Sequence, residues 1–333
     1  MSSPMSPAAG DAAATATAAE ARLAHLPVTL FSIVMGLAGL AIAWGKVLAG
    51  TALAQPGSVA IGIIASGVLV LLLLCYATKV VSHRAQVVAE LHHPVRINFF
   101  PTLSISLLLL SVVWQPWPSV ALPLWLTGAA LQLGLTLLVM SSWIHHGHFA
   151  IHHASPAWFI PVVGNIVVPL SGSHFGFVEL SWFFFSIGLL FWLVLLTIVM
   201  YRLFFHEPLP QRMTPTLFIL LAPPSVGFVA YTSLIGGLDQ GARVLYYSAL
   251  FLALLLASNA ARFWRTPFFL SSWAFSFPLA ALAIASARMA QLGQLPLLHG
   301  LAQGLLLLLT LIVLWLVART LMAVRQRQIC VAE

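Results

Sequence analysis

Histidine is the residue whose number and spacing first suggest chemistry in this chain. Five histidines fall within nine residues, at His145, His146, His148, His152 and His153. Such a cluster could bind a transition metal, but metal sites commonly add a carboxylate or a cysteine, and neither is nearby in the sequence. Cys75 and Cys330 stand alone. We therefore expect no metal and no cofactor, and we interpret the histidine-rich stretch as a solvated loop of unassigned role.

Acidic residues are scarce, and none lies in the middle of an apolar segment. The seven are Asp11, Glu20, Glu90, Glu179, Glu207, Asp239 and Glu333. Pumps and ion-coupled carriers generally need ionisable groups at membrane depth. No G-x-S-x-G, H-E-x-x-H or paired intramembrane carboxylate occurs, and Ser173 and His174 form only a weak polar cluster. The chain is therefore predicted not to be an enzyme, and passive movement of an anion is favoured.

Phe277 and Pro278 interrupt a long apolar stretch, residues 270–292. Proline removes a backbone donor and crowds the preceding turn, so a helix here should bend. A bulky aromatic at such a bend can project into whatever the helix lines. We therefore predict that Phe277 stands in a pore, beside a bend at Pro278.

The elements that must position these residues are membrane spans. Only 6% of the residues are charged, against roughly a quarter in soluble domains. Ten apolar segments approach the ~20 residues that a bilayer requires. They are residues 27–49, 58–82, 94–115, 120–144, 157–173, 178–204, 214–236, 241–263, 269–292 and 295–318.

Basic residues are distributed unevenly between the two ends of these spans. Lys46, Arg243 and Arg288 fall at one end, and eleven fall at the end that holds both termini: Arg22, Lys79, Arg84, Arg96, Arg202, Arg212, Arg262, Arg265, Arg319, Arg325 and Arg327. The positive-inside rule then places both termini in the cytoplasm. Because the bases are scattered between apolar spans, the net charge of +7 does not indicate nucleic-acid binding.

A proline recurs near the start of every odd-numbered span, at intervals of 52 to 67 residues: Pro27, Pro94, Pro156, Pro215 and Pro267. This recurrence predicts five repeats of a helical hairpin. Broken helices are tolerated in lipid only where protein or water satisfies their backbone. We therefore expect a pseudo-five-fold ring in which the odd helices line a central pore and the even helices face lipid.

Small polar and aromatic residues on the odd spans are the pore-lining candidates: Phe31, Ser32, Asn98, Ser104, Phe159, Asn165, Phe218, Ser225 and Ser276. The alternative is that the small ones merely let helices pack closely. Lys46, Arg96 and Arg288 are candidates for basic residues at the pore mouths. The alternative for each of these is snorkelling to the membrane interface.

Three stretches, in order along the chain, resemble the TehA tellurite-resistance/dicarboxylate transporters. They are L-P-V-T-L-F-S-I-V-M-G-L-A-G-L-A-I-A-W from Leu26, E-L-H-H-P-V-R-I-N-F from Glu90, and W-A-F-S-F from Trp273. Slow anion channels of plant guard cells and fungal malate and sulfite transporters belong to the same superfamily. The resemblance implies a ring of five hairpins, a homotrimer with one pore per subunit, and a plug at Phe277. With this resemblance we predict that Phe277 is the gate of the pore, held in place by the bend at Pro278. Ser32 replaces a glycine of the family pattern, and Pro278 follows the plant branch.

The sequence thus predicts an all-α integral membrane protein with a disordered cytoplasmic tail (1–25), a ten-helix channel domain (26–320) and a cytoplasmic C-terminal tail (321–333). The expected setting is a bacterial inner membrane. The expected function is a passive anion channel or channel-like exporter for small inorganic anions, with malate or other dicarboxylates as further substrates. The alternatives are a proton-linked carrier for four-carbon dicarboxylates, tellurite or sulfite export, and a scaffold or sensor without a lumen.

Overall fold

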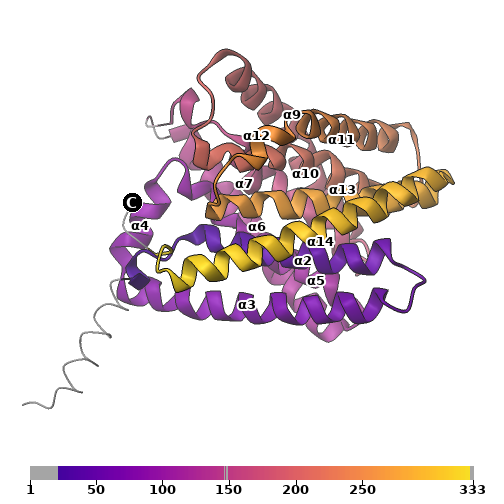
Figure 1. The fold of residues 1–333 in the computed structure, drawn as a ribbon, viewed down its shortest axis with the longest axis horizontal. Helices are drawn as coiled ribbons and strands as arrows, with labels where there is room; N and C mark the ends of the chain where they lie inside the picture. The colour runs from indigo at the N-terminus through magenta and orange to yellow at the C-terminus, as the bar shows by residue number, and fades with distance from the viewer. Residues whose placement is uncertain (1–21, 146, 148, 331–333) are drawn as a thin grey trace, which may run out of the picture.

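The computed structural model describes residues 22–145, 147 and 149–330, and the chain within those limits is helical without strands. Within this described part of the chain, nine helices are long and apolar enough to cross a membrane, which confirms a multi-pass membrane protein. The remaining predicted span corresponds to a shorter apolar segment, Pro156–Gly172. The helices run roughly along one long axis (Figure 1).

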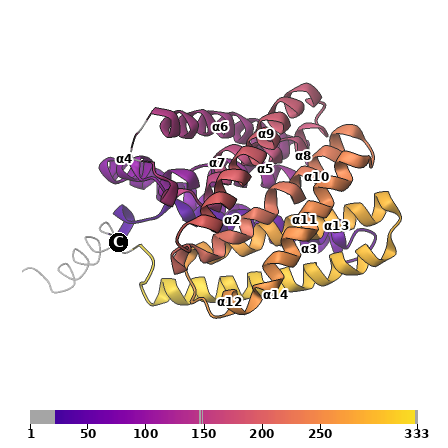
Figure 2. The same cartoon turned by 90° about the horizontal axis from the view of Figure 1, so that it is seen from above.

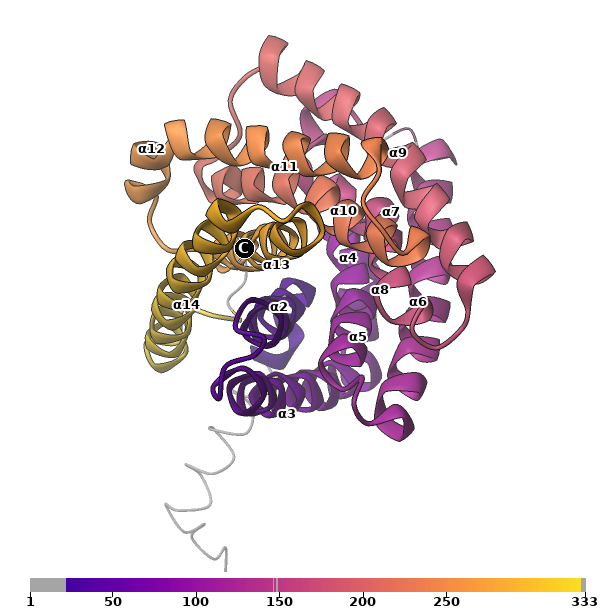
Figure 3. The ribbon, with the colours of Figure 1, turned by 90° about the vertical axis from the view of Figure 1, so that its right-hand side faces the viewer.

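Five long helices form the outside of the molecule. They are α3 (Ala54–Ser82), α6 (Pro118–His145), α9 (Val178–Phe205), α11 (Gln240–Ser258) and α14 (Pro296–Arg325). Within the most apolar window of each, only 17% to 33% of the residues are buried. Figure 3 shows these helices around the periphery, and Figure 2 shows α6 and α14 on opposite edges. Apolar all round and exposed, they are suited to face lipid.

The helices between them are shorter and more deeply buried. They are α2 (Phe31–Val47), α5 (Pro101–Val113), the pair α7 (Phe159–Val163) and α8 (Pro169–Gly172), α10 (Ala222–Ile235) and α13 (Ser276–Gly293). The four of these spans that are long enough to cross a membrane are 56% to 78% buried within their apolar windows. The predicted division into buried broken spans and exposed continuous spans is therefore present in the structure.

Each inner span begins with a 3-10 segment. These segments are η1 (Val28–Leu30), η2 (Arg96–Phe99), η4 (Pro156–Trp158), η6 (Gln211–Leu221) and η7 (Leu270–Phe275), and η5 (Gly164–Val167) separates α7 from α8. Proline explains much of this pattern, because a ring without an N–H suits the first turn of a helix and interrupts a longer one.

Side chains bond to backbone carbonyl groups where 3-10 segments interrupt the inner helices. In every inner span a Ser, Thr or Asn donates to the carbonyl oxygen three residues earlier, over 2.5 to 2.6 Å. The donors are Ser32, Thr102, Asn165, Thr216 and Ser276. Inside a bilayer an unpaired carbonyl is costly, so these short local bonds make the breaks tolerable.

The histidine-rich connection follows α6. His146 and His148 lie outside the described residues. His145 Nδ1 lies 2.9 Å from the carbonyl oxygen of Ser141, and the rings of His152 and His153 pack at 4.0 Å. Among the described residues no group of three or more potential metal ligands converges.

The two predicted tails are described only in part. Arg22–His25 form a helical turn, and the rest of the predicted N-terminal tail lies outside the described residues. At the other end α14 continues to Arg325, after which Arg327 adopts a φ of 59° and reverses the chain. Burial raises the pKa of the Cys330 thiol in this returning segment.

A buried ion pair joins the first hairpin to the short helix α4 (Arg84–His92). Lys79 Nζ lies 3.0 Å from Glu90 Oε2, and the two side chains are 1% and 5% exposed. Lys79 also donates to the carbonyl oxygen of Leu26, and the Tyr76 hydroxyl donates to Glu90. The pair thereby ties α3 and α4 to the start of the first inner span.

We predict that Glu90→Gln destabilises the protein by on the order of 3 kcal/mol, because it leaves a buried ammonium without its counter-charge. Adding Lys79→Met should restore much of the loss, since the remaining groups are then neutral. The measurement is thermal unfolding of the purified protein in detergent. The exposed Glu207→Gln is the control, and equal melting temperatures for Glu90→Gln and wild type would contradict the role of the pair.

Candidate functional site

The inner helices enclose a wide cavity of about 710 Å³ at the end of the molecule where the inner spans begin. Residues near the start of all five inner spans line it, among them Pro27, Arg96, Phe159, Thr216 and Leu270. Gln328, Ile329 and Cys330 of the returning C-terminal segment also reach its wall.

A second, narrow cavity of about 370 Å³ lies toward the opposite end. Its walls come from later positions of the same spans, including Ile42, Val112, Leu170, Val229 and Ile284. The five inner spans therefore run in the same direction, with the wide cavity at their beginnings and the narrow cavity toward their ends. The two cavities lie along one axis through the molecule.

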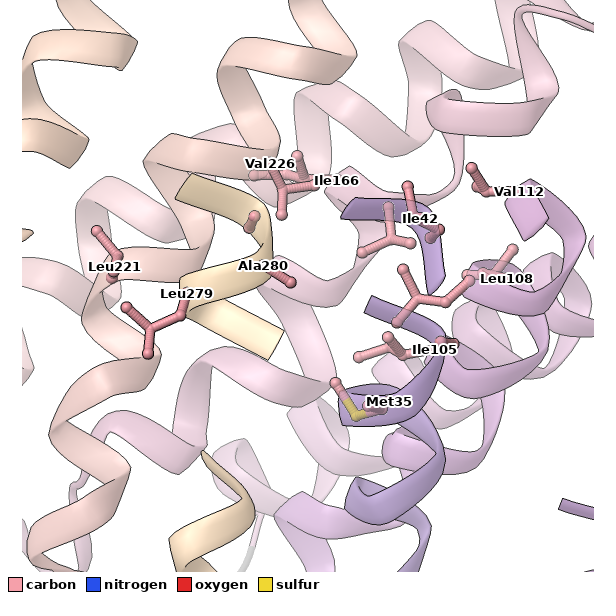
Figure 4. Packing of buried hydrophobic residues seen from close by; sticks show 14 of the residues in the cluster. Met35, Ile42, Ile105, Leu108, Val112, Ile166, Leu221, Val226, Leu279 and Ala280 are labelled. Atoms are coloured by element: carbon pink, nitrogen blue, oxygen red, sulfur yellow. The ribbon is translucent and has the colours of Figure 1, made fainter. Parts of the chain in front are cut away.

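Phe277 and Val226 line both cavities, so they mark the point where the cavities approach each other. Phe277 is half-buried, whereas Val226 is 5% exposed. Figure 4 shows Ile42, Ile166 and Val226 among the buried apolar side chains, and each comes from a separate element. The two residues that line both cavities are therefore apolar, and one of them is aromatic.

The change from 3-10 to α-helix positions the Phe277 ring. η7 ends at Phe275 and α13 begins at Ser276, so Phe277 lies in the first turn of α13. Pro278 follows within that turn, where a helix has no acceptor for a backbone N–H. The interruption predicted around Pro278 therefore takes the form of a helix start. Trp273 Nε1 donates to Thr320 Oγ1 over 3.0 Å and holds this start against α14.

Two glycines let α2 approach the helix that carries Phe277. A Cβ atom on Gly36 would overlap Ser276 Oγ and come within 2.8 Å of Trp273 Cε3. A Cβ atom on Gly39 would lie 3.1 Å from Ala280 Cβ and 3.3 Å from Phe277 Cδ2. Small residues at this crossing thus set how far the Phe277 ring lies from α2.

The two cavities differ in how their charges are balanced. The wall of the wide cavity includes the paired Lys79 and Glu90 together with Arg96 and Arg212. The narrow cavity is lined by Lys46 and Arg288 with the polar Gln115, Ser233 and Gln291. Among the described residues that line the narrow cavity there is no aspartate or glutamate.

Several of the predicted site residues reach these cavities. Ser32, Phe159, Arg96 and Pro278 line the wide cavity, Lys46 and Arg288 line the narrow one, and Phe277 lines both. Their proposed roles in transport remain predictions.

Seven pore-lining candidates line neither cavity: Phe31, Asn98, Ser104, Asn165, Phe218, Ser225 and Ser276. Asn98, Ser225 and Ser276 donate to carbonyl groups of their own spans. Ser104 and Asn165 reach Gln132 and Thr136 of α6. Phe31 is buried in the core, and Phe218 packs against Phe263 and Phe275. The small polar residues among them bond within or between helices in this structure, and their proposed place on a pore wall stays a prediction.

Sequence reasoning missed the aliphatic residues of the cavity walls, such as Met35, Ile42, Ile105, Ile166 and Val226. A search for polar residues could not have found them, and a valine or isoleucine on an apolar span has no distinguishing signal. Gly39, which lines the narrow cavity, did have a distinguishing signal in the sequence, because a glycine within an apolar span indicates that two helices approach closely.

This geometry defines a class of protein: an all-helical membrane protein with two cavities that approach each other at an aromatic residue. The family model described as SLAC1, voltage-dependent anion channel, matches residues 25–321. The chain therefore belongs to the SLAC1 family, which contains anion channels and transporters rather than enzymes.

Individual relatives agree with this assignment. The S-type anion channel SLAH3 of Arabidopsis thaliana is 32% identical over 280 residues, which cover 80% of this chain and 44% of the plant protein. The tellurite resistance protein TehA homolog of Haemophilus influenzae is 32% identical over 264 residues, which cover 78% of this chain and 79% of the relative. An uncharacterized transporter of Methanocaldococcus jannaschii, MJ0576, is 28% identical over 286 residues, which cover 77% of this chain and 81% of the relative. The chain spans about half the length of the plant relatives SLAH3 and SLAH2.

We predict that Gly36→Ala lowers the stability of the protein by about 1–3 kcal/mol, because the added methyl group has no space between α2 and α13. Thermal unfolding in detergent is the measurement. Gly67→Ala on α3 is a matched control, since no atom lies within 4 Å of its added Cβ. If both variants melt at the wild-type temperature, the crossing is looser than these distances indicate.

Proposed function

We propose that this protein is a passive anion channel or channel-like exporter whose conduction path joins the two cavities and is closed by Phe277. The carrying observation is that the Phe277 ring lines both cavities. In this proposal the spans form a pseudo-five-fold ring of five helical hairpins, and displacement of the ring merges the cavities into one pore. Small inorganic anions pass, and malate or another dicarboxylate is a further substrate.

Three features support the proposal that the transported ion is an anion and that transport is passive. The relatives include proteins named anion channels. The cavities present Arg96 and Arg212 at one end and Lys46 and Arg288 at the other. The apolar constriction offers no carboxylate to coordinate a cation or relay a proton, so a positive potential at the mouths would favour anions.

We also propose that the protein lies in a bacterial inner membrane with both termini in the cytoplasm and assembles as a homotrimer. The support for orientation is the excess of basic residues at the end that holds the termini. The support for the trimer is the family resemblance. With this orientation the wide cavity opens to the cytoplasm and the narrow cavity opens to the outside.

Phe277→Ala is expected to increase anion conductance at least ~10-fold over wild type, because removal of the ring opens the constriction between the cavities. The measurement is current in oocytes or planar bilayers, with reversal potentials recorded in chloride, nitrate, sulfite and malate.

Phe275→Ala is the matched control for this experiment. Phe275 lies two residues earlier, packs against Phe218 and Phe263, and lines neither cavity. Its currents should stay at the wild-type level. Wild-type currents from a normally expressed Phe277→Ala protein would refute the gate.

A proton-linked carrier for four-carbon dicarboxylates is the second candidate. The observation in its favour is that Glu90, a buried carboxylate, lines the wide cavity. Its ion pair with Lys79 and its place on α4, outside the inner spans, favour the structural role.

The two functions make different predictions for liposomes that contain the purified protein. A passive channel should transport malate at a rate set by the electrochemical gradient of malate alone, so a pH gradient should leave the rate unchanged at clamped voltage. A carrier should transport faster with an inward proton gradient and lose this response in Glu90→Gln. Accumulation of malate against its own gradient would overturn the channel proposal.

A further inference from the structure

The narrow cavity brings together two basic side chains that are far apart in the sequence. Lys46 lies in the last turn of α2, and Arg288 lies in the second half of α13. Both line the cavity, Lys46 is exposed, and Arg288 is half-buried. Phe277 forms part of the same wall. An anion bound between the two cations would therefore share its cavity with the gate.

The meeting of these two residues is more specific than a general positive surface. The sequence places only three basic residues at this end of the spans, namely Lys46, Arg243 and Arg288. Arg243 is exposed on α11 and does not line the cavity. Snorkelling alone would bring each side chain to water separately. It would not require two of the three to converge on one cavity.

No acidic side chain among the described lining residues balances this pair. Two acids belong to the same end of the molecule, Glu179 and Asp239, and neither lines the cavity. Asp239 caps α11 by accepting from the Ala242 amide and also accepts from the Tyr231 hydroxyl, and these bonds lower its pKa. Its charge is thus engaged locally. The arrangement contrasts with the wide cavity, where Glu90 neutralises Lys79.

We propose that the narrow cavity is a binding site for a dianion, a sulfate-like oxyanion or a short dicarboxylate, held between Lys46 and Arg288 beside Phe277. Two cations without a counter-charge repel each other, and a dianion neutralises both, whereas a monoanion leaves one uncompensated. The arginine fork matches a planar carboxylate or two oxygens of an oxyanion. Gln291 and Ser233 add neutral polar groups to the wall.

This site deepens the proposed function, because it names the class of anion that is recruited to the pore. Gln115 helps to shape it, since its side-chain amide donates to the Leu170 carbonyl oxygen over 3.0 Å and to Ser171 Oγ over 3.3 Å. These bonds hold one wall of the cavity in place. The site needs no movement of Phe277, so a closed protein should bind the dianion.

The test is calorimetric titration of the full-length protein in detergent with sulfate, succinate and nitrate at one fixed ionic strength. We expect sulfate and succinate to bind at least ~10-fold more tightly than nitrate, because each meets both cations. Lys46→Gln and Arg288→Gln should each weaken sulfate binding at least ~10-fold and bring it close to nitrate.

Two controls keep the result interpretable. Arg243→Gln removes a charge from the same end without touching the cavity and should bind sulfate like wild type. Lys46→Arg keeps the charge and should retain sulfate binding, which separates loss of charge from loss of folding. Equal affinities for sulfate and nitrate, unchanged binding in the two neutral variants, or an equal loss in Arg243→Gln would each overturn the site.

The binding assay is independent of conduction. If Phe277→Ala conducts anions but sulfate binding does not depend on Lys46 and Arg288, the dianion site is wrong and the channel stands. If sulfate binds as predicted but Phe277→Ala remains silent, the site stands and the gated channel is wrong.

Discussion

A chain that crosses a bilayer must satisfy the hydrogen bonding of its own backbone, and the inner half of this molecule depends on how it does so. The five inner spans do not begin as regular α-helices. Each begins as a 3-10 segment, and in each a side chain bonds to the carbonyl three residues earlier. These local bonds let the spans be short and interrupted, and the space between their beginnings becomes the wide cavity.

Because polar side chains of the inner spans are bonded to backbone carbonyls, much of the cavity wall near Phe277 is apolar. Ser276, Asn98 and Asn165 are fully buried, and the Ser276 hydroxyl and the two amide nitrogens donate to backbone carbonyls, so these donors are engaged within the protein. The surface near Phe277 is instead made of groups such as Ile42, Val226 and Ala281. An ion there receives little replacement for its hydration shell, which makes width and dehydration cost the main determinants of selection.

Much of the architecture could be predicted from the sequence because proline and charge act locally. The recurrent prolines indicated which spans are interrupted and buried, and the proline beside Phe277 drew attention to the one aromatic that lines both cavities. The orientation of individual side chains could not be predicted in the same way. Ser225 and Val226 are neighbours, yet only Val226 lines the cavities, because a helix turns by about 100° per residue and its phase was unknown. The count of apolar residues also predicted a full membrane span where the structure has the shorter segment Pro156–Gly172. The segment is short because 3-10 segments and prolines divide it.

The common direction of the inner spans gives the molecule an electrical polarity of its own. Aligned peptide dipoles leave partial positive charge at the beginnings of helices and partial negative charge at their ends, equivalent to roughly half an elementary charge each. The beginnings of α2, α5, α10 and α13 all lie toward the wide cavity, so their dipoles add rather than cancel. At the narrow cavity the same helices present carbonyl ends, whose partial negative charge disfavours anions unless nearby cations outweigh it. Lys46 in the last turn of α2 therefore offsets a field that the fold itself creates, and the two ends of the axis become electrostatically more alike than the backbone alone would make them.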